Sequence, residues 1–245
     1  GTLTGTALAE MGFVDELKAF LRWYAPFQLD DGQVPCAVDL HGIDRVPEHD
    51  SHGQLAWGIV EAYRLTGDTD FLREMWPHVL RAAAAIEMLR ARCTVDAYRD
   101  TPYFGLLPES ISHEGYSSRP VHSYWDDFFA LRGLTDAADA AAILGDEATA
   151  ADIAEMRDAM RADLHTSIER AMRDHGIDFV PGSADLGDFD PTSTAIAFDP
   201  CDEADGLPAT ALARTFDRYW EEFQARHRGD HPADAYTAYE VRTAG

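Results

Sequence analysis

Positive charge and cysteine are both scarce in this sequence. Its 245 residues include 20 lysines and arginines against 44 aspartates and glutamates, which gives a formal net charge of −24 at pH 7. Such a surface repels phosphate backbones and anionic lipid headgroups, so we expect neither a nucleic acid nor a membrane among the partners. The three cysteines, Cys36, Cys93 and Cys201, are far apart, and their spacing fits neither a zinc site nor a disulfide framework.

The sequence also lacks the hydrophobic segments that direct a chain into or across a membrane. No apolar run approaches the ~20 residues of a membrane span, and the alanine-rich stretch at residues 82–86 is short. Residues 1–13 contain no basic region followed by an apolar run, so no signal peptide is visible. We expect a soluble chain, and the missing signal favours the cytoplasm without deciding the compartment.

Strand-like alternation is nearly absent, and residues 177–180 are the only candidate. Helical spacing dominates instead, with apolar residues recurring at intervals of three and four. This spacing predicts helices over residues 13–24, 55–63, 71–89, 124–144, 148–175 and 208–227, and a seventh that begins near Pro232. We therefore expect an all-α fold that forms a single domain over residues 1–245.

The connections between these helices alternate between short and long. Each short turn, at residues 67–68, 145–146 and 229–230, pairs a glycine that ends one helix with an aspartate that caps the next. A helical hairpin therefore repeats about every 80 residues. Because alternate connections of an up-and-down array emerge at the same end, we expect the long connections to share one face, where long loops usually carry function. These long connections are residues 29–50, 93–122 and 176–207.

Acidic and aromatic residues gather in all three long connections. Carboxylates accept hydrogen bonds from sugar hydroxyls, and aromatic rings stack on the apolar faces of sugars. Such loops suit a polyhydroxyl ligand. The alternative is that a chain with this many acids places several in any long loop by composition alone.

The second long connection and the helix after it carry the most specific pattern, YFGLLPESISHEGYSSRPVHSYWDDFFALRGL. Together with the hairpin repeat, it resembles the six-hairpin, (α/α)6-toroid glycoside hydrolases, a group that includes glucoamylases, trehalases, processing α-glucosidases and rhamnosidases. The third connection, GSADLGDFDPTST, also resembles bacterial relatives of this group. The resemblance implies a carbohydrate substrate, hydrolysed by a general acid and a base carboxylate without a cofactor, and it favours inversion at the anomeric carbon.

The resemblance also suggests which carboxylates act. In several members an acid that follows tryptophan at the start of an inner helix protonates the leaving oxygen, and here Asp126 and Asp127 follow Trp125. Asp126 is our first candidate for the general acid and Glu109 the second. Adjacent helical residues point about 100° apart, so only one of the two aspartates is expected to face the ligand. Both could instead be first-turn acids favoured by the helix dipole.

Aromatic residues divide between the expected site and the expected core. We expect Trp57 and Trp125 to form a stacking platform for a sugar. Trp23, Trp76 and Trp220 lie on apolar stripes and are expected in the core. The remaining candidates for carbohydrate contacts are Tyr124, His122, Glu114, Arg119, Asp50, Asp185 and Asp188.

Two clusters contain groups that could bind a metal ion, and we expect neither to do so. Residues 48–52 include two histidines, but Asp50 is also a natural N-cap and no distant third ligand is evident. Asp185, Asp188 and Asp190 have an oxygen-rich spacing that suits calcium, but the last two more simply form turns.

The chain is short for the group that it resembles. Six hairpins of ~80 residues need nearly twice this length. We therefore expect about half of a toroid, incomplete at the C-terminus, whose remainder supplies the opposite wall and the catalytic base. Residues 1–245 alone would then be catalytically silent and expose an apolar flank. Two alternatives stay open: a non-catalytic glycan-binding or helical-repeat scaffold module, and another α-toroid enzyme such as a polysaccharide lyase.

Overall fold

The computed structural model describes residues 1–112, 115–230, 240–241 and 243. Helices account for 64% of the chain and strands for 3%, so the prediction of an all-α fold is confirmed. The α-helices of the described residues are α1 (Thr2–Glu10), α2 (Val14–Tyr24), α3 (Asp50–Thr66), α4 (Thr69–Ala91), α5 (Tyr124–Leu144), α6 (Glu147–His175), α7 (Pro191–Ala195) and α8 (Ala209–Arg228). None of them is long and apolar enough to span a bilayer.

The remaining regular structure is short and lies in the connections. Strands β1 (Val38–Asp39) and β2 (Gly42–Ile43) form an antiparallel pair in the first connection. Single 3-10 turns occur at Ala25–Phe27, Asp96–Tyr98 and Ala204–Gly206.

Six predicted helices are present close to their predicted bounds: α2, α3, α4, α5, α6 and α8. The sequence pattern missed α1, in which glycine and threonine lower the helix propensity, and the short helix α7. The strand candidate at residues 177–180 does not form a strand, because residues 178–179 are bends and their two neighbours are irregular. The seventh helix predicted near Pro232 lies outside the described residues.

Glycine–aspartate pairs form the short turns between paired helices, as predicted. Gly67 ends α3 with a φ of 67°, and Gly145 ends α5 with a φ of 85°. Glycine adopts this left-handed conformation without a steric penalty. Asp68 and Asp146 then cap α4 and α6, each accepting a hydrogen bond from the third following backbone N–H, at 3.0 and 3.2 Å. The caps satisfy helix ends within the turns themselves.

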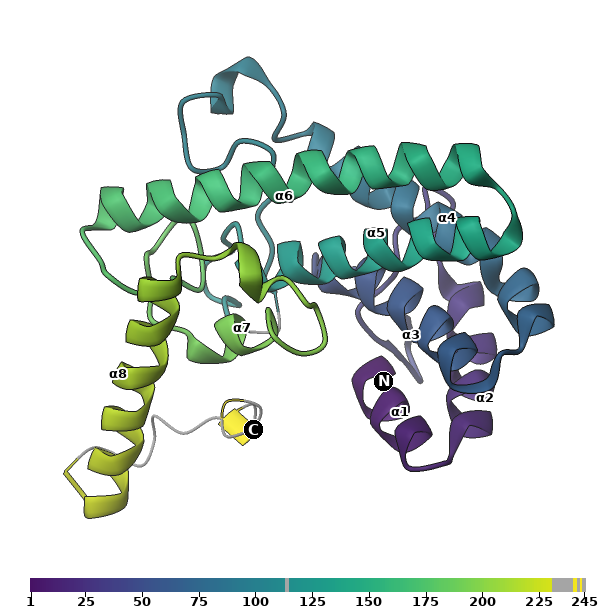
Figure 1. The fold of residues 1–245 in the computed structure, drawn as a ribbon, viewed down its shortest axis with the longest axis horizontal. Coiled ribbons are helices and arrows are strands. Elements are labelled where there is room, and N and C mark those ends of the chain that lie inside the picture. The colour runs from purple at the N-terminus through teal and green to yellow at the C-terminus, as the bar shows by residue number, and fades with distance from the viewer. Residues whose placement is uncertain (113–114, 231–239, 242, 244–245) are drawn as a thin grey trace.

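The hairpins stand side by side in two layers. Helix α3 packs between α1 and α5, and these three helices form the inner layer. Helices α2, α4 and α6 each cover their hairpin partner from the outside, which is the alternation that the hairpin repeat predicts. The layers curve into an arc, with α1 and α2 at one end and α8 at the other (Figure 1).

Two glycines allow α3 and α5 to cross in close contact. A Cβ atom on Gly53 would lie 1.8 Å from the carbonyl oxygen of Phe129, and one on Gly133 would lie 2.5 Å from the Cα of Gly53. No side chain fits at these separations. The crossing therefore fixes the distance between α3 and α5, and with it the distance between the two long connections that lead into them.

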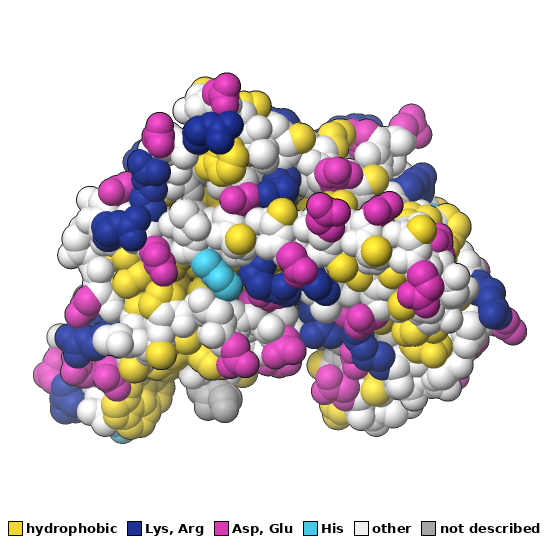
Figure 2. Space-filling model, turned by 45° about the horizontal axis from the view of Figure 1, so that its top comes forward, with side chains coloured by type: hydrophobic (Ala, Val, Ile, Leu, Met, Phe, Trp, Pro, Cys, Tyr) yellow, Lys and Arg dark blue, Asp and Glu magenta, His cyan; other side chains and the backbone are white. Residues whose placement is uncertain are grey.

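Helix α5 supplies the centre of the core, where Trp125 and Phe128 are 1% and 0% exposed. Trp76 packs against this core as predicted. The prediction is wrong for Trp23 and Trp220, which are 51% and 55% exposed. In α2 the stripe that packs against α1 and α3 consists of Leu17, Leu21 and Tyr24, and Trp23 lies beside it. In α8 the buried positions are Ala211, Thr215 and Tyr219, and Trp220 lies next to them. Figure 2 shows hydrophobic side chains gathered over α8, at the lower left.

Candidate functional site

The three long connections meet at one end of the hairpins, as predicted. The backbone N–H of Ile111 donates to the Pro47 carbonyl at 3.0 Å, which joins the second connection to the first. The backbone N–H of Ala184 donates to the His122 carbonyl at 3.0 Å, which joins the third to the second. Side chains from separate hairpins can therefore form one site on a shared backbone frame.

Glu109, His122 and Asp185 form a group that we call the Glu109 cluster. Each contributes one oxygen or nitrogen atom, and these atoms all lie within 4.8 Å of one another. Asp185 accepts a hydrogen bond from the His122 backbone N–H at 2.7 Å and contacts the ring Nδ1 at 3.1 Å. The His122 side chain is buried, Asp185 is half-buried and Glu109 is exposed. The cluster thus extends from the protein interior to solvent.

Asp185 is ionised in this setting. Burial alone would raise its pKa, but hydrogen bonds from His122 and the electrostatic influence of His122 and Arg119 hold the pKa below its usual value. An ionised carboxylate only accepts hydrogen bonds. Asp185 can therefore bind a hydroxyl, stabilise a positive charge or attack an electrophilic carbon.

Tyrosine rings border the cluster. Tyr103 stacks on the His122 ring with centroids 4.4 Å apart and planes 19° apart, and Tyr98 meets both rings edge-on. Burial and the Asp185 charge raise the Tyr103 pKa, so its hydroxyl stays protonated. Sequence analysis did not single out these two tyrosines as site residues. The only available signal was the aromatic content of the second connection.

The Glu109 cluster is the one group within the described residues whose donor atoms are close enough to hold a metal ion. One imidazole and two carboxylates suit a divalent first-row cation. Water would have to complete its coordination, because three protein ligands leave positions open. The sequence predicted no metal at these residues, so a chelation test belongs with any activity measurement.

Asp126 is buried and binds the segment that directly follows Glu109. Its carboxylate is 1% exposed and accepts hydrogen bonds from Ser110 Oγ at 2.5 Å, Ser112 Oγ at 3.1 Å and the His49 backbone N–H at 3.4 Å. Burial and the nearby Asp50 carboxylate raise the Asp126 pKa to about 7. A general acid needs such a pKa. Ser110 and Ser112 of the second connection bind this carboxylate and keep it from solvent, so its predicted place at the pocket wall is not observed, and the role of Asp126 as general acid stays a prediction.

Asp127 is also buried, with 0% exposure. It accepts a hydrogen bond from the Leu107 backbone N–H at 2.9 Å, and burial raises its pKa. Only one of the two aspartates was expected to face the ligand, and in this structure neither side chain reaches solvent. Together, Asp126 and Asp127 fix the chain on both sides of Glu109.

The other predicted contacts at the start of α3 and α5 are core residues. Trp125 and Tyr124 are 1% and 0% exposed, so neither ring can stack on a ligand. The Trp125 indole N–H donates to Asp50 at 2.8 Å, and Gln54 donates to the same carboxylate at 2.7 Å. Asp50 is the first residue of α3 and His49 takes the N-cap position, so the predicted cap at Asp50 is wrong. The predicted sugar contact is wrong because this carboxylate is buried and accepts from two protein donors.

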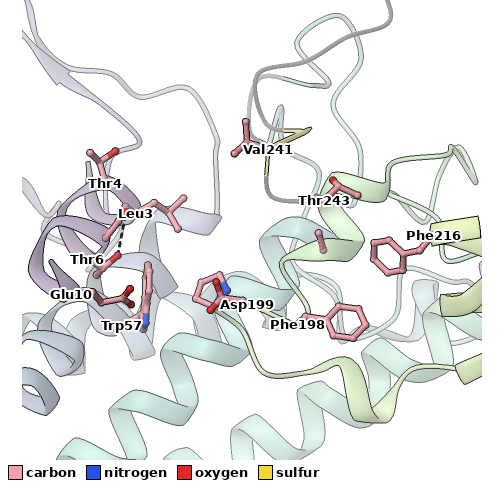
Figure 3. A pocket seen from close by; sticks show the side chains of 13 residues that line it. Leu3, Thr4, Thr6, Glu10, Trp57, Phe198, Asp199, Phe216, Val241 and Thr243 are labelled. Atoms are coloured by element: carbon pink, nitrogen blue, oxygen red, sulfur yellow. Dashed lines mark hydrogen bonds between the residues drawn. The ribbon is translucent and has the colours of Figure 1, made fainter. Parts of the chain in front are cut away.

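Trp57 lies in a different place, in a groove of about 1000 Å³ between α1 and the segment from α7 to α8 (Figure 3). Leu3 faces it from α1, and Phe198 and Phe216 line the far side. The expectation that Trp57 shares a pocket with Glu109 is wrong, because Trp57 lies about two turns into α3 and away from the loop end.

Asp188 and Asp190 stabilise the third connection. Both Asp188 oxygens accept from protein hydroxyls, Tyr116 at 2.7 Å and Ser183 at 2.6 Å, which corrects its predicted sugar contact. Asp190 caps α7 by accepting from the backbone N–H groups of Thr192 and Ser193. The simpler reading of both residues as turn formers fits these contacts.

Of the predicted site residues, the structure brings together Glu109, His122, Asp185 and Arg119. Glu114 lies outside the described residues. No protein-family model and no curated protein sequence matches this chain. The function of the site must therefore be argued from its own geometry.

Proposed function

We propose that the Glu109 cluster binds a carbohydrate and hydrolyses its glycosidic bond. The observation that carries this proposal is the placement of exposed Glu109 beside ionised Asp185, with His122 in the same group. Hydrolysis through an oxocarbenium-like transition state needs one carboxyl group that protonates the leaving oxygen and one ionised carboxylate near the anomeric carbon. Glu109 takes the first role and Asp185 the second, and Tyr103 offers a ring face to the sugar.

The spacing of this pair favours retention of configuration. The oxygens of Glu109 and Asp185 lie within 4.8 Å of each other. That is close to the ~5–5.5 Å of retaining pairs and short of the ~6.5–9.5 Å that inverting pairs need for a water molecule. In this proposal Asp185 attacks the anomeric carbon, and Glu109 then activates the water that releases the sugar.

Asp126 and Asp127 act as positioning residues in this proposal. They bind the segment from Leu107 to Ser112, which carries Glu109, and do not touch the substrate. The resemblance to toroid glycosidases is supported by the alternation of inner and outer helices and by the convergence of the long connections. We also propose that further helical structure completes such a toroid by packing into the groove beside Trp57, between α1 and the α7–α8 segment.

A polysaccharide lyase is the second candidate, favoured by the stacked pair Tyr103 and His122. A lyase would use such groups to remove the proton from the carbon that bears the carboxylate of a uronic acid. Arg119, near Asp185, could then neutralise the carboxylate of that substrate. The strongly acidic chain counts against an anionic polymer, so we rank this candidate second.

The test is an assay of the purified chain on a panel of aryl glycosides and disaccharides, with proton NMR to identify the anomer formed first. The resemblance implied that this chain alone would be catalytically silent, but both carboxylates of the proposed pair lie within it. We therefore expect turnover with net retention that survives EDTA and is lost in Glu109→Gln. Glu16→Gln, at an exposed glutamate of α2, is the matched control and should keep full activity.

Other outcomes separate the alternatives. Inversion would place the base outside the Glu109–Asp185 pair, and inhibition by EDTA would give the cluster a metal. Absorbance of an unsaturated product on uronic acid polymers would favour the lyase. Saturable binding without any turnover would favour a glycan-binding module.

A further inference from the structure

The first long connection forms a pocket at the loop end of the hairpins, the end that also carries the Glu109 cluster. It has a volume of about 210 Å³ and is lined by His49 and His52 together with residues between Leu29 and Glu48. Within the described residues, His49 Nε2 and both ring nitrogens of His52 have no hydrogen-bond partner. The three nitrogens have almost no accessible surface, so a ligand reaches them only when the side chains that cover them shift. Because buried polar atoms are normally paired, these nitrogens nevertheless indicate a ligand or ordered water.

Both histidines are neutral in this pocket. Their side chains are 3% and 1% exposed, and their rings meet edge-to-face at 5.9 Å. Burial lowers the pKa of His49 to about 4 and that of His52 to about 3. A neutral imidazole presents one N–H donor and one nitrogen acceptor. The unpaired nitrogens are therefore complementary to a ligand that both donates and accepts hydrogen bonds.

The charges around the pocket narrow the ligand further. Asp31, Asp44 and Glu48 line it against a single cation, Arg45, so an anionic ligand is repelled. A metal ion is not pre-organised here either, because no three donor atoms of this pocket are as close as those of the Glu109 cluster. A neutral hydroxylated molecule can donate and accept hydrogen bonds, and the acidic lining does not repel it.

We propose that this pocket binds one neutral sugar unit, whose hydroxyl groups pair with the rings of His49 and His52. A hydroxyl group donates and accepts, as the two neutral rings require. The pocket is smaller than the ~300–1,000 Å³ of sites for drug-sized ligands, which suits a single sugar ring. The choice of a sugar over another polyol rests on the proposed function.

A backbone hydrogen bond connects the pocket to the segment that carries Glu109. Pro47, in its lining, accepts the backbone hydrogen bond from Ile111, two residues after Glu109. The His49 ring also hydrogen-bonds to the Glu109 backbone, and this bond raises the His49 pKa against the effect of burial. The sugar unit in this pocket would therefore belong to the same oligosaccharide as the bond beside Glu109, and the pocket would act as an additional subsite.

The test records the imidazole nitrogen signals of the histidines by proton–nitrogen NMR while glucose, mannose, galactose or rhamnose is added. We expect the His49 and His52 signals to shift saturably, with a dissociation constant on the order of 1 mM for so small a ligand. Val46→Trp should weaken this binding by about tenfold or more, because Val46 lines the pocket and is 39% exposed. Leu40→Trp is the matched control and should leave binding unchanged, since Leu40 lies on the exposed β1–β2 turn.

The possible results separate this proposal from the proposed function. Unchanged His49 and His52 signals with all four sugars would overturn the subsite, even in a chain that hydrolyses glycosides, and would leave ordered water as the occupant. Shifts at both histidines that Val46→Trp removes would support the subsite, even in a chain without turnover. Shifts caused by Zn²⁺ and by no sugar would overturn it in favour of a metal site.

Discussion

The two ends of the helical hairpins use polar groups in different ways. At the turn end, Gly67–Asp68 and Gly145–Asp146 satisfy helix ends locally. At the loop end, three connections hydrogen-bond to one another, and buried carboxylates hold the segment that carries Glu109. A change at the turn end should therefore affect stability alone and by a small amount. A change at the loop end should affect stability and function together.

The largest effect is expected at Glu109, where function can be lost without loss of stability. Glu109→Gln should lower kcat/KM for a cleaved glycoside by about 10²- to 10⁴-fold, the usual contribution of a positioned proton donor. The melting temperature should stay unchanged, because the side chain is exposed. Steady-state kinetics and thermal unfolding of the same preparation check both statements. Equal activity of variant and wild type would remove Glu109 from the mechanism.

Asp126→Ala should destabilise the loop segment that carries Glu109. It leaves Ser110, Ser112 and the His49 N–H without their buried acceptor. We expect the free energy of unfolding to fall by about 2–3 kcal/mol, with a loss of activity that follows the displaced loop. Asp126→Asn keeps one acceptor oxygen and should restore most of both quantities. An Asn variant that is fully stable yet as inactive as Glu109→Gln would instead make Asp126 the proton donor.

The buried His52 should make the loop end sensitive to acid. Its pKa is about 3 in the folded chain, against an ordinary value of 6.5. As the pH falls below 6.5, the unfolded chain takes up a proton that the folded chain does not, so the free energy of unfolding decreases. Between pH 7 and pH 5, His52→Asn should lose about 1–2 kcal/mol less stability than wild type. Denaturant unfolding at both pH values measures this difference, and parallel losses would contradict it.

The smallest effect is expected at the turn end. Asp146→Ala removes the cap of α6, which accepts from the Thr149 N–H at 3.2 Å. Loss of such a cap costs about 1 kcal/mol, and activity should not change because the turn lies at the opposite end from Glu109. Chemical denaturation and the glycoside assay check the two halves of this statement. A change in kcat/KM would show that the two ends are coupled.

Most of the fold could be predicted because its signals are local. Apolar spacing and the Gly–Asp turns mark α2 to α6 and α8 within a few residues. Helix α1 escaped because its threonines and Gly5 weaken the local signal, and its stability comes from packing instead. Thr2 of α1 fits against Gly58 of α3, where an added Cβ would lie 2.5 Å from the threonine methyl group. A contact across 56 positions leaves no pattern in a short window.

The candidate site could be predicted only in part. The connection lengths indicated which loops meet, and so Glu109, His122 and Asp185 were candidates before their positions were known. The burial of Asp126 depends on Ser110 and Ser112, whose hydroxyls reach back to it from the preceding loop. The place of Trp57 depends on the curvature that brings the α7–α8 segment opposite α1. Neither feature has a signal in the sequence around the residue.

The most direct test of the central claim is a crystal structure of the Glu109→Gln variant soaked with a glycoside that the wild type cleaves. We predict that the glycosidic oxygen lies within about 3 Å of the residue 109 amide and that the anomeric carbon faces Asp185. Asp126 should still bind Ser110 and Ser112 beneath the loop. A sugar that contacts Asp126 directly, or one bound only in the groove beside Trp57, would contradict the account.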